Sequence, residues 1–167
     1  GKKDPYPPEV AWIEIPAGIS KPRIPDEIMT KEEAMTLVDT ADNARDRAFV
    51  YVLYESGARV GEMLKLRRKH IEFDEYGALL SLSGKTGRRV IRIIESVATL
   101  SAWLDMHPMK DDRKAFVWVG VKYGVCPMKY NTANFITEHL AKKAGINKDA
   151  NPHAFRHARA THLANYL

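Results

Sequence analysis

The sequence predicts an α+β domain, mainly α-helical, in which helices pack around a small antiparallel β-sheet. Apolar residues recur at helical spacing over most of the chain, and two short β-branched segments flank a glycine-containing turn in its middle. The composition agrees, since 167 residues with 45% hydrophobic and 28% charged residues fit one globular domain with a core of its own. A disordered or collagen-like chain is excluded.

Helix start and stop signals divide the body of the chain. Thr30 and Glu33 form a capping-box pattern, Gly57 supplies a left-handed residue after the second helix, and Asn151-Pro152 precedes the last one. The expected helices cover residues 31–41, 43–55, 60–66, 96–106, 131–144 and a last segment from residue 153 onward.

Strand signals lie between the third and fourth helices. Residues 79–83 and 89–94 alternate at period two or are β-branched, and the short GKTGR segment joins them. This pattern predicts a hairpin with Lys85 at its tip. Residues 115–119, AFVWV, predict a third short strand.

The two ends of the chain differ from this body. Residues 1–25 hold six of the nine prolines and predict an extended linker or arm from a preceding domain. The last ten residues keep a helical pattern without a stop signal after it, so we expect the domain, residues 26–167, to be C-terminally incomplete.

Membrane insertion and secretion are not expected. The longest unbroken apolar stretch, residues 49–54, is far shorter than the ~20 residues of a membrane-spanning helix. Residues 1–10 lack the apolar core of a secretory signal, and the single cysteine, Cys126, has no partner for an internal disulfide. We therefore expect a reducing, cytoplasmic location and no membrane partner.

Charge is unevenly distributed along the chain. Residues 1–56 carry 7 basic and 11 acidic residues, whereas residues 57–167 carry 19 basic and 10 acidic ones. A basic half indicates a polyanionic partner, most simply nucleic acid, although many basic proteins bind none.

The segment ESGARVGEML contains the first candidate site. Arg59 lies between a glycine-terminated helix and the start of the next helix, where free backbone N–H groups favour an anion. Its guanidinium can form bidentate hydrogen bonds with a phosphate. The alternative is a solvated Arg59 beside Glu62, an acid that complements the helix dipole.

The segment GKTGRRV is the second candidate. A Walker A loop would need glycine where Leu79 stands and a helix after the lysine, so a nucleotide-binding loop is excluded. What remains is Lys85 on a turn, flanked by Arg88 and Arg89; the alternative is a lysine that only keeps the sheet edge in water.

The segment NPHAFRHARATHL is the third candidate. His153, Arg156 and His157 lie at positions i, i+3 and i+4, so one face at the positive end of a helix presents imidazole and guanidinium together. This face suits oxyanion stabilisation and proton transfer. A zinc site lacks the glutamate of an HExxH pattern, and a purely structural histidine pair is the other alternative.

The order of these motifs resembles the catalytic domain of tyrosine recombinases, the phage integrase family. ESGARVGEML, a lysine in a hairpin, and HAFRH followed by ATHL occur in that order, and GIN at residues 145–147 also fits. The resemblance covers residues 30–167. It implies a tyrosine recombinase type of fold and an enzyme that cleaves and rejoins double-stranded DNA through a 3′-phosphotyrosyl link.

The same resemblance implies roles for four residues. Arg59 and Arg156 would neutralise the non-bridging oxygens of the scissile phosphate, whose charge grows in the transition state. Lys85 would donate a proton to the leaving 5′-oxygen, and His153 would be the acid/base partner at the phosphate. No metal and no cofactor are implied.

Further residues would support these four. Glu62 would orient Arg59. His157 would support the residues that contact the phosphate. Both His157 and His162 would pack or form hydrogen bonds within their helix. Arg88 and Arg89 would bind DNA. The full-length protein would assemble on DNA as a synaptic tetramer.

The expected nucleophile departs from the family pattern. The family's nucleophilic tyrosine and the His or Trp before it fall beyond Leu167, and Tyr166 lies ten residues past Arg156, ~15 Å along a helix. We therefore expect a truncated catalytic domain without its nucleophile. A DNA-binding protein that kept the fold and lost catalysis, and a metal-dependent hydrolase built on the histidines, are the alternatives.

Overall fold

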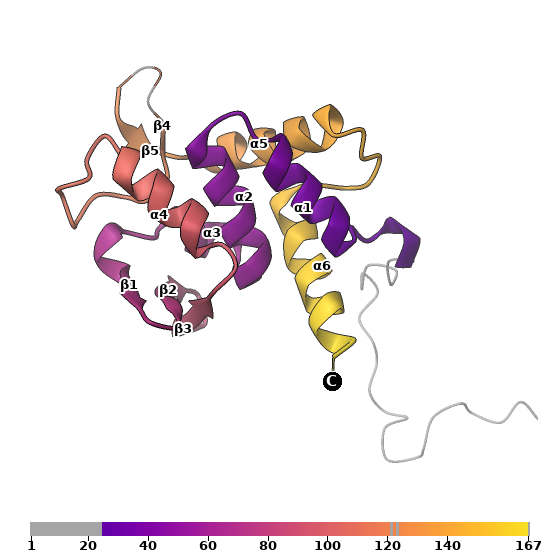
Figure 1. The fold of residues 1–167 in the computed structure, drawn as a ribbon, viewed down its shortest axis with the longest axis horizontal. Coiled ribbons are helices and arrows are strands. Elements are labelled where there is room, and N and C mark those ends of the chain that lie inside the picture. Colours follow the sequence, from indigo (N-terminus) through magenta and orange to yellow (C-terminus); the bar gives the residue numbers. More distant parts are fainter. Residues whose placement is uncertain (1–24, 121, 123, 167) are drawn as a thin grey trace, which may run out of the picture.

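The computed structural model describes residues 25–120, 122 and 124–166 (Figure 1). Apart from Pro25, the expected arm at residues 1–25 lies outside these residues. The helices are α1 (Lys31–Thr40), α2 (Ala44–Ser56), α3 (Val60–Leu64), α4 (Val97–Met106), α5 (Tyr130–Lys143) and α6 (Pro152–Ala164), with short 3-10 helices η1 (Pro25–Glu27) and η2 (Arg68–His70). The strands are β1 (Ile71–Asp74), β2 (Gly77–Gly84), β3 (Gly87–Ile93), β4 (Val119–Gly120) and β5 (Cys126–Pro127).

Local signals in the sequence place the helix ends. Thr30 and Glu33 form the predicted capping box at the start of α1. Gly57 ends α2 with φ of 57°, a left-handed conformation that glycine adopts without steric cost. Asn151 caps α6 by accepting a hydrogen bond from the Ala154 N–H. These three predictions are confirmed.

The central sheet is antiparallel with the strand order β1-β2-β3. Gly84 pairs with Gly87, so Lys85 and Thr86 form a two-residue turn and the predicted hairpin is confirmed. The third strand is β1, whose pairing with β2 joins Ile71 to Leu80.

The prediction of a third strand at residues 115–119 is wrong. Only Val119 is a strand residue there, and it belongs to a separate two-stranded sheet with β5. Before Val119 the segment pairs only through an isolated antiparallel bridge between Phe116 and Arg67. Val117 and Trp118 are both fully buried, so the apolar run reflects burial on both sides of the chain. The Val117 N–H donates to the carbonyl of Leu66, and the Trp103 indole donates to the carbonyl of Val117. These bonds satisfy the backbone of a buried loop.

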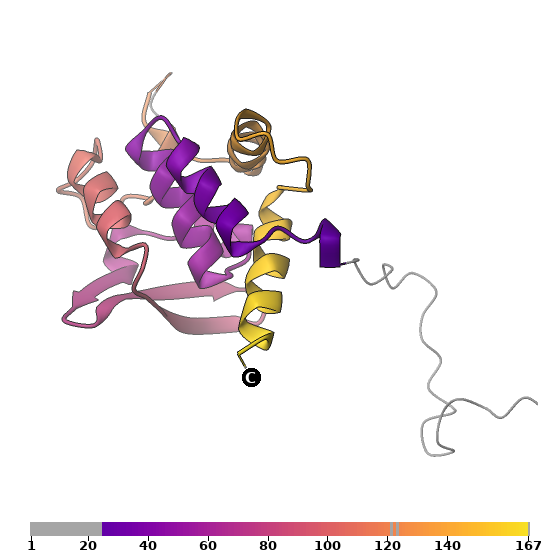
Figure 2. The ribbon, with the colours of Figure 1, turned by 45° about the vertical axis from the view of Figure 1, so that its right-hand side comes forward.

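Helix α2 is the centre of the core and packs on α1, α4 and α6. Figure 2 shows the central sheet on one side of α2 and α5 on the other, with α6 descending from α5 beside α2. Within the described part of the chain, no helix combines the length and apolar character of a membrane span.

The carboxylate of Glu55, near the end of α2, holds the chain where it passes from β3 to α4. It accepts hydrogen bonds from three consecutive backbone N–H groups, those of Ile94, Glu95 and Ser96, at 2.7, 2.9 and 2.8 Å. The Ser96 hydroxyl donates a fourth at 2.6 Å. One side chain of α2 thus fixes the sheet relative to α4.

Candidate functional site

Arg59 lies in the sharp connection between α2 and α3. Gly57 ends one helix and Val60 begins the next, so Arg59 occupies the N-cap position of α3. Glu62, in the first turn of α3, accepts a hydrogen bond from the Arg59 N–H at 2.9 Å, and its Oε1 lies 3.7 Å from Arg59 Nη1. The side chain of Glu62 is 2% exposed and that of Arg59 48%. Glu62 therefore anchors the turn from inside while Arg59 faces solvent.

Arg89 of β3 provides the strongest contact of the Glu62 carboxylate. Arg89 Nη2 donates to Glu62 Oε2 at 2.6 Å. Burial raises the pKa of Glu62, but the hydrogen bonds from Arg89 and the Arg59 N–H, together with both positive charges, outweigh it and hold the pKa below its usual value. Glu62 is therefore ionised at neutral pH.

Arg156 of α6 completes the group. Arg156 Nη1 donates to the carbonyl of Gly57 at 2.5 Å, two residues before Arg59. The pKa of Arg156 lies below its ordinary value because of burial and the nearby charges of Arg59 and Arg89. Arg59, Glu62, Arg89 and Arg156, hereafter the arginine cluster, thus gather three guanidinium groups around one carboxylate. The excess positive charge suits an anion.

The histidines of α6 divide into two kinds. His153, one turn before Arg156, and His157 are exposed, and their rings meet edge to face with centroids 5.8 Å apart. His162 was expected to bond within its helix, but its Nδ1 lies 2.6 Å from the hydroxyl of Tyr54 in α2. The cause is the packing of α6 on α2, which brings the two rings together. His162 therefore joins two helices and lies outside the site.

Lys85 is exposed at the hairpin tip, and no hydrogen bond or ion pair of its side chain occurs within residues 25–166 as far as they are described. Its neighbour Gly84 lies against Glu62: a Cβ placed on Gly84 would be 2.9 Å from Glu62 Oε1. Lys85 therefore directly follows, in the sequence, a residue that lies against the arginine cluster. Arg88, on the opposite face of the sheet from Arg89, is exposed.

Sequence reasoning missed two contributors to this region. Gly84 was read only as part of the turn that carries Lys85, although its lack of a side chain makes room for Glu62. Arg159 lies one turn after Arg156, with its Nε buried and its guanidinium 5.7 Å from the centre of the Tyr54 ring. The sequence signal for Arg159 is its position three residues after Arg156, which places both arginines on the same side of the helix.

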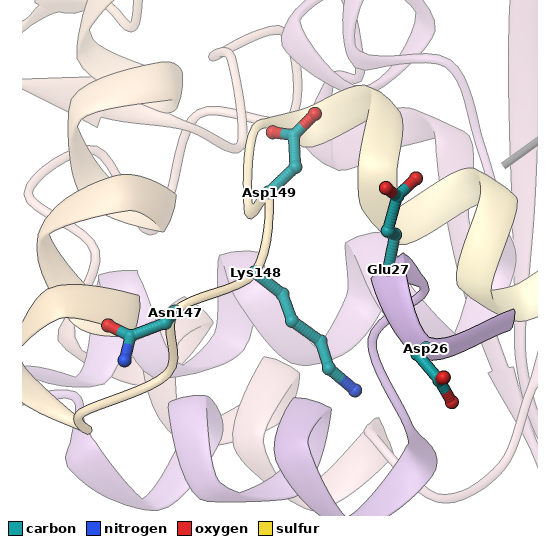
Figure 3. A pocket seen from close by; sticks show the side chains of 5 residues that line it. All are labelled: Asp26, Glu27, Asn147, Lys148 and Asp149. Atoms are coloured by element: carbon teal, nitrogen blue, oxygen red, sulfur yellow. The ribbon is translucent and has the colours of Figure 1, made fainter. Parts of the chain in front are cut away.

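Other places were considered as sites. Among the described residues, no group of three or more His, Cys, Asp or Glu side chains lies close enough to hold a metal ion. A hollow of about 320 Å³ is lined by Asp26, Glu27, Asn147, Lys148 and Asp149 (Figure 3). The ammonium group of Lys148 donates hydrogen bonds to the Ile28 carbonyl and the Glu33 carboxylate. The hollow contains no residue of the three motifs.

Comparison with known proteins decides the family. The sequence profile of the phage integrase family matches residues 27–166. The chain belongs to the phage integrase family. Both the expected family and the expected fold class, a mainly helical α+β domain of tyrosine recombinase type, are confirmed.

The relatives include named recombinases. The chain is 32% identical over 122 residues to tyrosine recombinase XerC of Bradyrhizobium diazoefficiens, covering 72% of this chain and 37% of that protein. It is 27% identical over 150 residues to tyrosine recombinase XerA of Pyrococcus horikoshii, covering 87% and 51%. The chain thus spans about half or less of these relatives.

Solved structures share the fold. The crystal structure of XerA recombinase matches with a TM-score of 0.70 and 27% identity, covering 83% of this chain and 51% of that one. A XerH site-specific recombinase bound to a palindromic difH substrate matches with a TM-score of 0.68 and 19% identity, covering 84% and 42%. At that identity the second likeness concerns the fold alone.

Proposed function

We propose that this catalytic domain cleaves and rejoins strands of double-stranded DNA through a 3′-phosphotyrosyl intermediate. The observation that carries the proposal is the arginine cluster, in which Arg156, from a distant part of the sequence, bonds the carbonyl of Gly57 two residues before Arg59 and lies close enough for the charge of Arg59 to lower its pKa. Two guanidinium groups at one place match the non-bridging oxygens of a phosphodiester. Membership of the phage integrase family supports this reaction class.

Each residue would act on a different atom of the phosphate. Arg59 and Arg156 would neutralise the two non-bridging oxygens as the phosphorus becomes pentacoordinate. Lys85 would deliver a proton to the 5′-oxygen as its bond to phosphorus breaks. His153, exposed on the first turn of α6, would exchange a hydrogen bond or proton at the phosphate. The tyrosine oxygen would form the new bond to phosphorus.

The nucleophile would come from outside these 167 residues. Helix α6 is continuous from Arg156 to Ala164, about 12 Å along its axis, and Tyr166 lies two residues beyond that end. Tyr54 is buried and bonded to His162, and burial raises the pKa of Tyr51 to about 12, with Glu95 adding to the rise. Tyr76 lies at the β1–β2 turn, away from α6. The longer protein would supply the tyrosine and assemble as a tetramer on DNA in the cytoplasm, with residues 1–25 as a linker and residues 26–167 as an incomplete catalytic domain.

DNA binding by the chain itself is the first test. We expect weak binding to duplex DNA with little sequence preference, and an affinity that falls steeply as salt rises, because neutralised phosphates release counterions. Arg59→Ala and Arg156→Ala should reduce the salt slope, whereas Arg113→Ala, on an exposed loop after α4, should not. Binding that is insensitive to salt contradicts the proposal.

Covalent chemistry is the second test, in the longer protein that carries this domain. Incubation with nicked duplex DNA should yield a covalent protein–DNA adduct, unaffected by chelator. Arg59→Ala should slow its formation by ~10²-fold or more, as expected for loss of one preorganised oxyanion donor. DNA binding without an adduct would instead indicate a fold retained for binding alone, and loss of activity with chelator would indicate a metal-dependent hydrolase.

A further inference from the structure

The carboxylate of Glu62 joins elements that carry different parts of the proposed chemistry. It belongs to α3, bonds the N–H of Arg59 at the start of that helix, and bonds the guanidinium of Arg89 in β3. It also lies next to Gly84 at the end of β2, the residue before Lys85, where an added Cβ would be 2.9 Å from Glu62 Oε1. The Lys85 hairpin and the Arg59 turn therefore meet at one buried carboxylate.

We propose that Arg89 is a positioning residue, which holds the Lys85 hairpin against the Arg59 turn through its ion pair with Glu62. The proposal rests on the proposed function, because it assigns Arg89 to the support of that site and not to contact with DNA.

The geometry of the pair supports this role. Arg89 Nη2 lies 2.6 Å from Glu62 Oε2, the length of a strong charge-assisted hydrogen bond. The Nε of Arg89 is buried without a hydrogen-bond partner among the described residues, so the bond to Glu62 is what holds this guanidinium. Arg89 pairs with Leu82 across the hairpin, three residues before Lys85 on β2. A bond at this register restrains the strand ends that lead into the turn.

Loss of Arg89 would act through Glu62. The Glu62 side chain, which is 2% exposed, would stay buried but lose its strongest counter-charge. Removing one partner of a buried ion pair destabilises a protein far more than removing one partner of an exposed pair. Glu62 would then take up a proton or turn toward solvent. Turning toward solvent would release both the contact with Gly84 and the bond to the Arg59 N–H, and protonation would weaken that bond.

Arg88 offers a matched control, because it is the preceding residue with the same charge. It pairs with Ser83 on the opposite face of the hairpin, is exposed, and makes no contact with Glu62. Arg88→Gln and Arg89→Gln remove the same charge from neighbouring positions, three and four residues after Lys85. An effect seen in both the Arg88 and the Arg89 variants would come from the lost charge. An effect seen only in the Arg89 variant would come from loss of the ion pair between Arg89 and Glu62.

The carboxyl titration of Glu62, followed by NMR of the chain with labelled glutamate, tests the pair directly. Arg89→Gln should raise the pKa of Glu62, because burial remains and the counter-charge is gone, and Arg88→Gln should leave it near its value in the unchanged protein. Arg89→Lys, which keeps the charge, should raise the pKa of Glu62 less than Arg89→Gln does. It also replaces Arg89→Gln in this test if that variant does not fold. Equal pKa values of Glu62 in the Arg88 and Arg89 variants overturn the proposal.

Single-turnover cleavage at saturating DNA, in the longer protein, tests the consequence. Arg89→Gln should slow cleavage ~10- to 100-fold while changing DNA affinity and its salt slope no more than Arg88→Gln does, and Arg89→Lys should recover part of the rate. Equal cleavage rates in the Arg88 and Arg89 variants, with weaker DNA binding in both, would make Arg89 a DNA contact. If the unchanged protein cleaves no DNA, the proposed function fails, and the titration of Glu62 still decides the role of Arg89.

Discussion

Replacement of Gly84 by alanine should destabilise the domain by moving the Glu62 carboxylate. The new Cβ would lie 2.9 Å from Oε1, 3.1 Å from Cγ and 3.4 Å from Cδ of Glu62. Ordinary contacts of this kind begin at about 3.5 Å, so the carboxylate or the strand end must move by roughly half an ångström. Glu62 cannot move freely, because Arg89 and the Arg59 N–H hold it at 2.6 and 2.9 Å.

The magnitude follows from two opposing effects. Overpacking a tight contact costs about 1–3 kcal/mol, and alanine recovers about 0.5–1 kcal/mol of the conformational entropy that glycine loses in a strand. The free energy of unfolding, measured by urea denaturation, should therefore fall by about 1 kcal/mol for Gly84→Ala. Gly61→Ala is the control: its Cβ meets no atom within 4 Å in α3, so it should stabilise the domain. A Gly84→Ala variant as stable as the Gly61→Ala one would show that Glu62 makes room for the methyl group without cost.

Other changes have equally defined outcomes. In the longer protein, Lys85→Ala should slow cleavage of normal DNA, and a substrate with a 5′-bridging sulfur, a better leaving group, should rescue this variant but not Arg59→Ala; equal rescue of both would contradict proton donation. Asn151→Ala should lower the free energy of unfolding by about 1 kcal/mol in urea, since it removes the cap of α6; an unchanged midpoint would count against the cap. Burial lowers the pKa of His107 and of His162 below the ordinary value of 6.5, so the unfolded chain binds more protons just below that pH. The free energy of unfolding should therefore fall between pH 7 and pH 5, and equal urea midpoints at the two pH values would disprove this.

Elements with local signals were predictable from sequence. The capping box at Thr30, the left-handed Gly57 and the Asn151-Pro152 pair each depend on neighbours within a few residues, so the chain carries their whole cause. Strand β1 was not predictable in this way. Its four residues, IEFD, alternate apolar and polar, but the run is too short to identify a strand by itself, and the pairing with β2 makes it one.

The sequence identifies Arg59, Glu62 and Arg156 as candidate site residues, but not the contacts that join Glu62 to Arg89 and bring it next to Gly84. Arg59, Glu62 and Arg156 stand out because charged groups cluster at helix starts. The pairing of Glu62 with Arg89 spans 27 residues and two kinds of secondary structure, so it depends on how the sheet packs on α3. The closeness of Gly84 to Glu62 follows from that same packing and has no trace in the sequence.

The grip of Glu55 on the chain after β3 has a consequence for local dynamics. Residues 94–96 form a bend after the last ladder pair of β3, in which Ile94 and Glu95 are exposed and Ser96 is buried. Backbone amide protons in exposed bends ordinarily exchange with solvent quickly. Because one carboxylate accepts all three of their N–H groups, these protons can exchange only when α2 and the bend separate. Their exchange rates should therefore follow the opening of the α2–α4 packing, so a bend without regular structure becomes a reporter on the stability of the core.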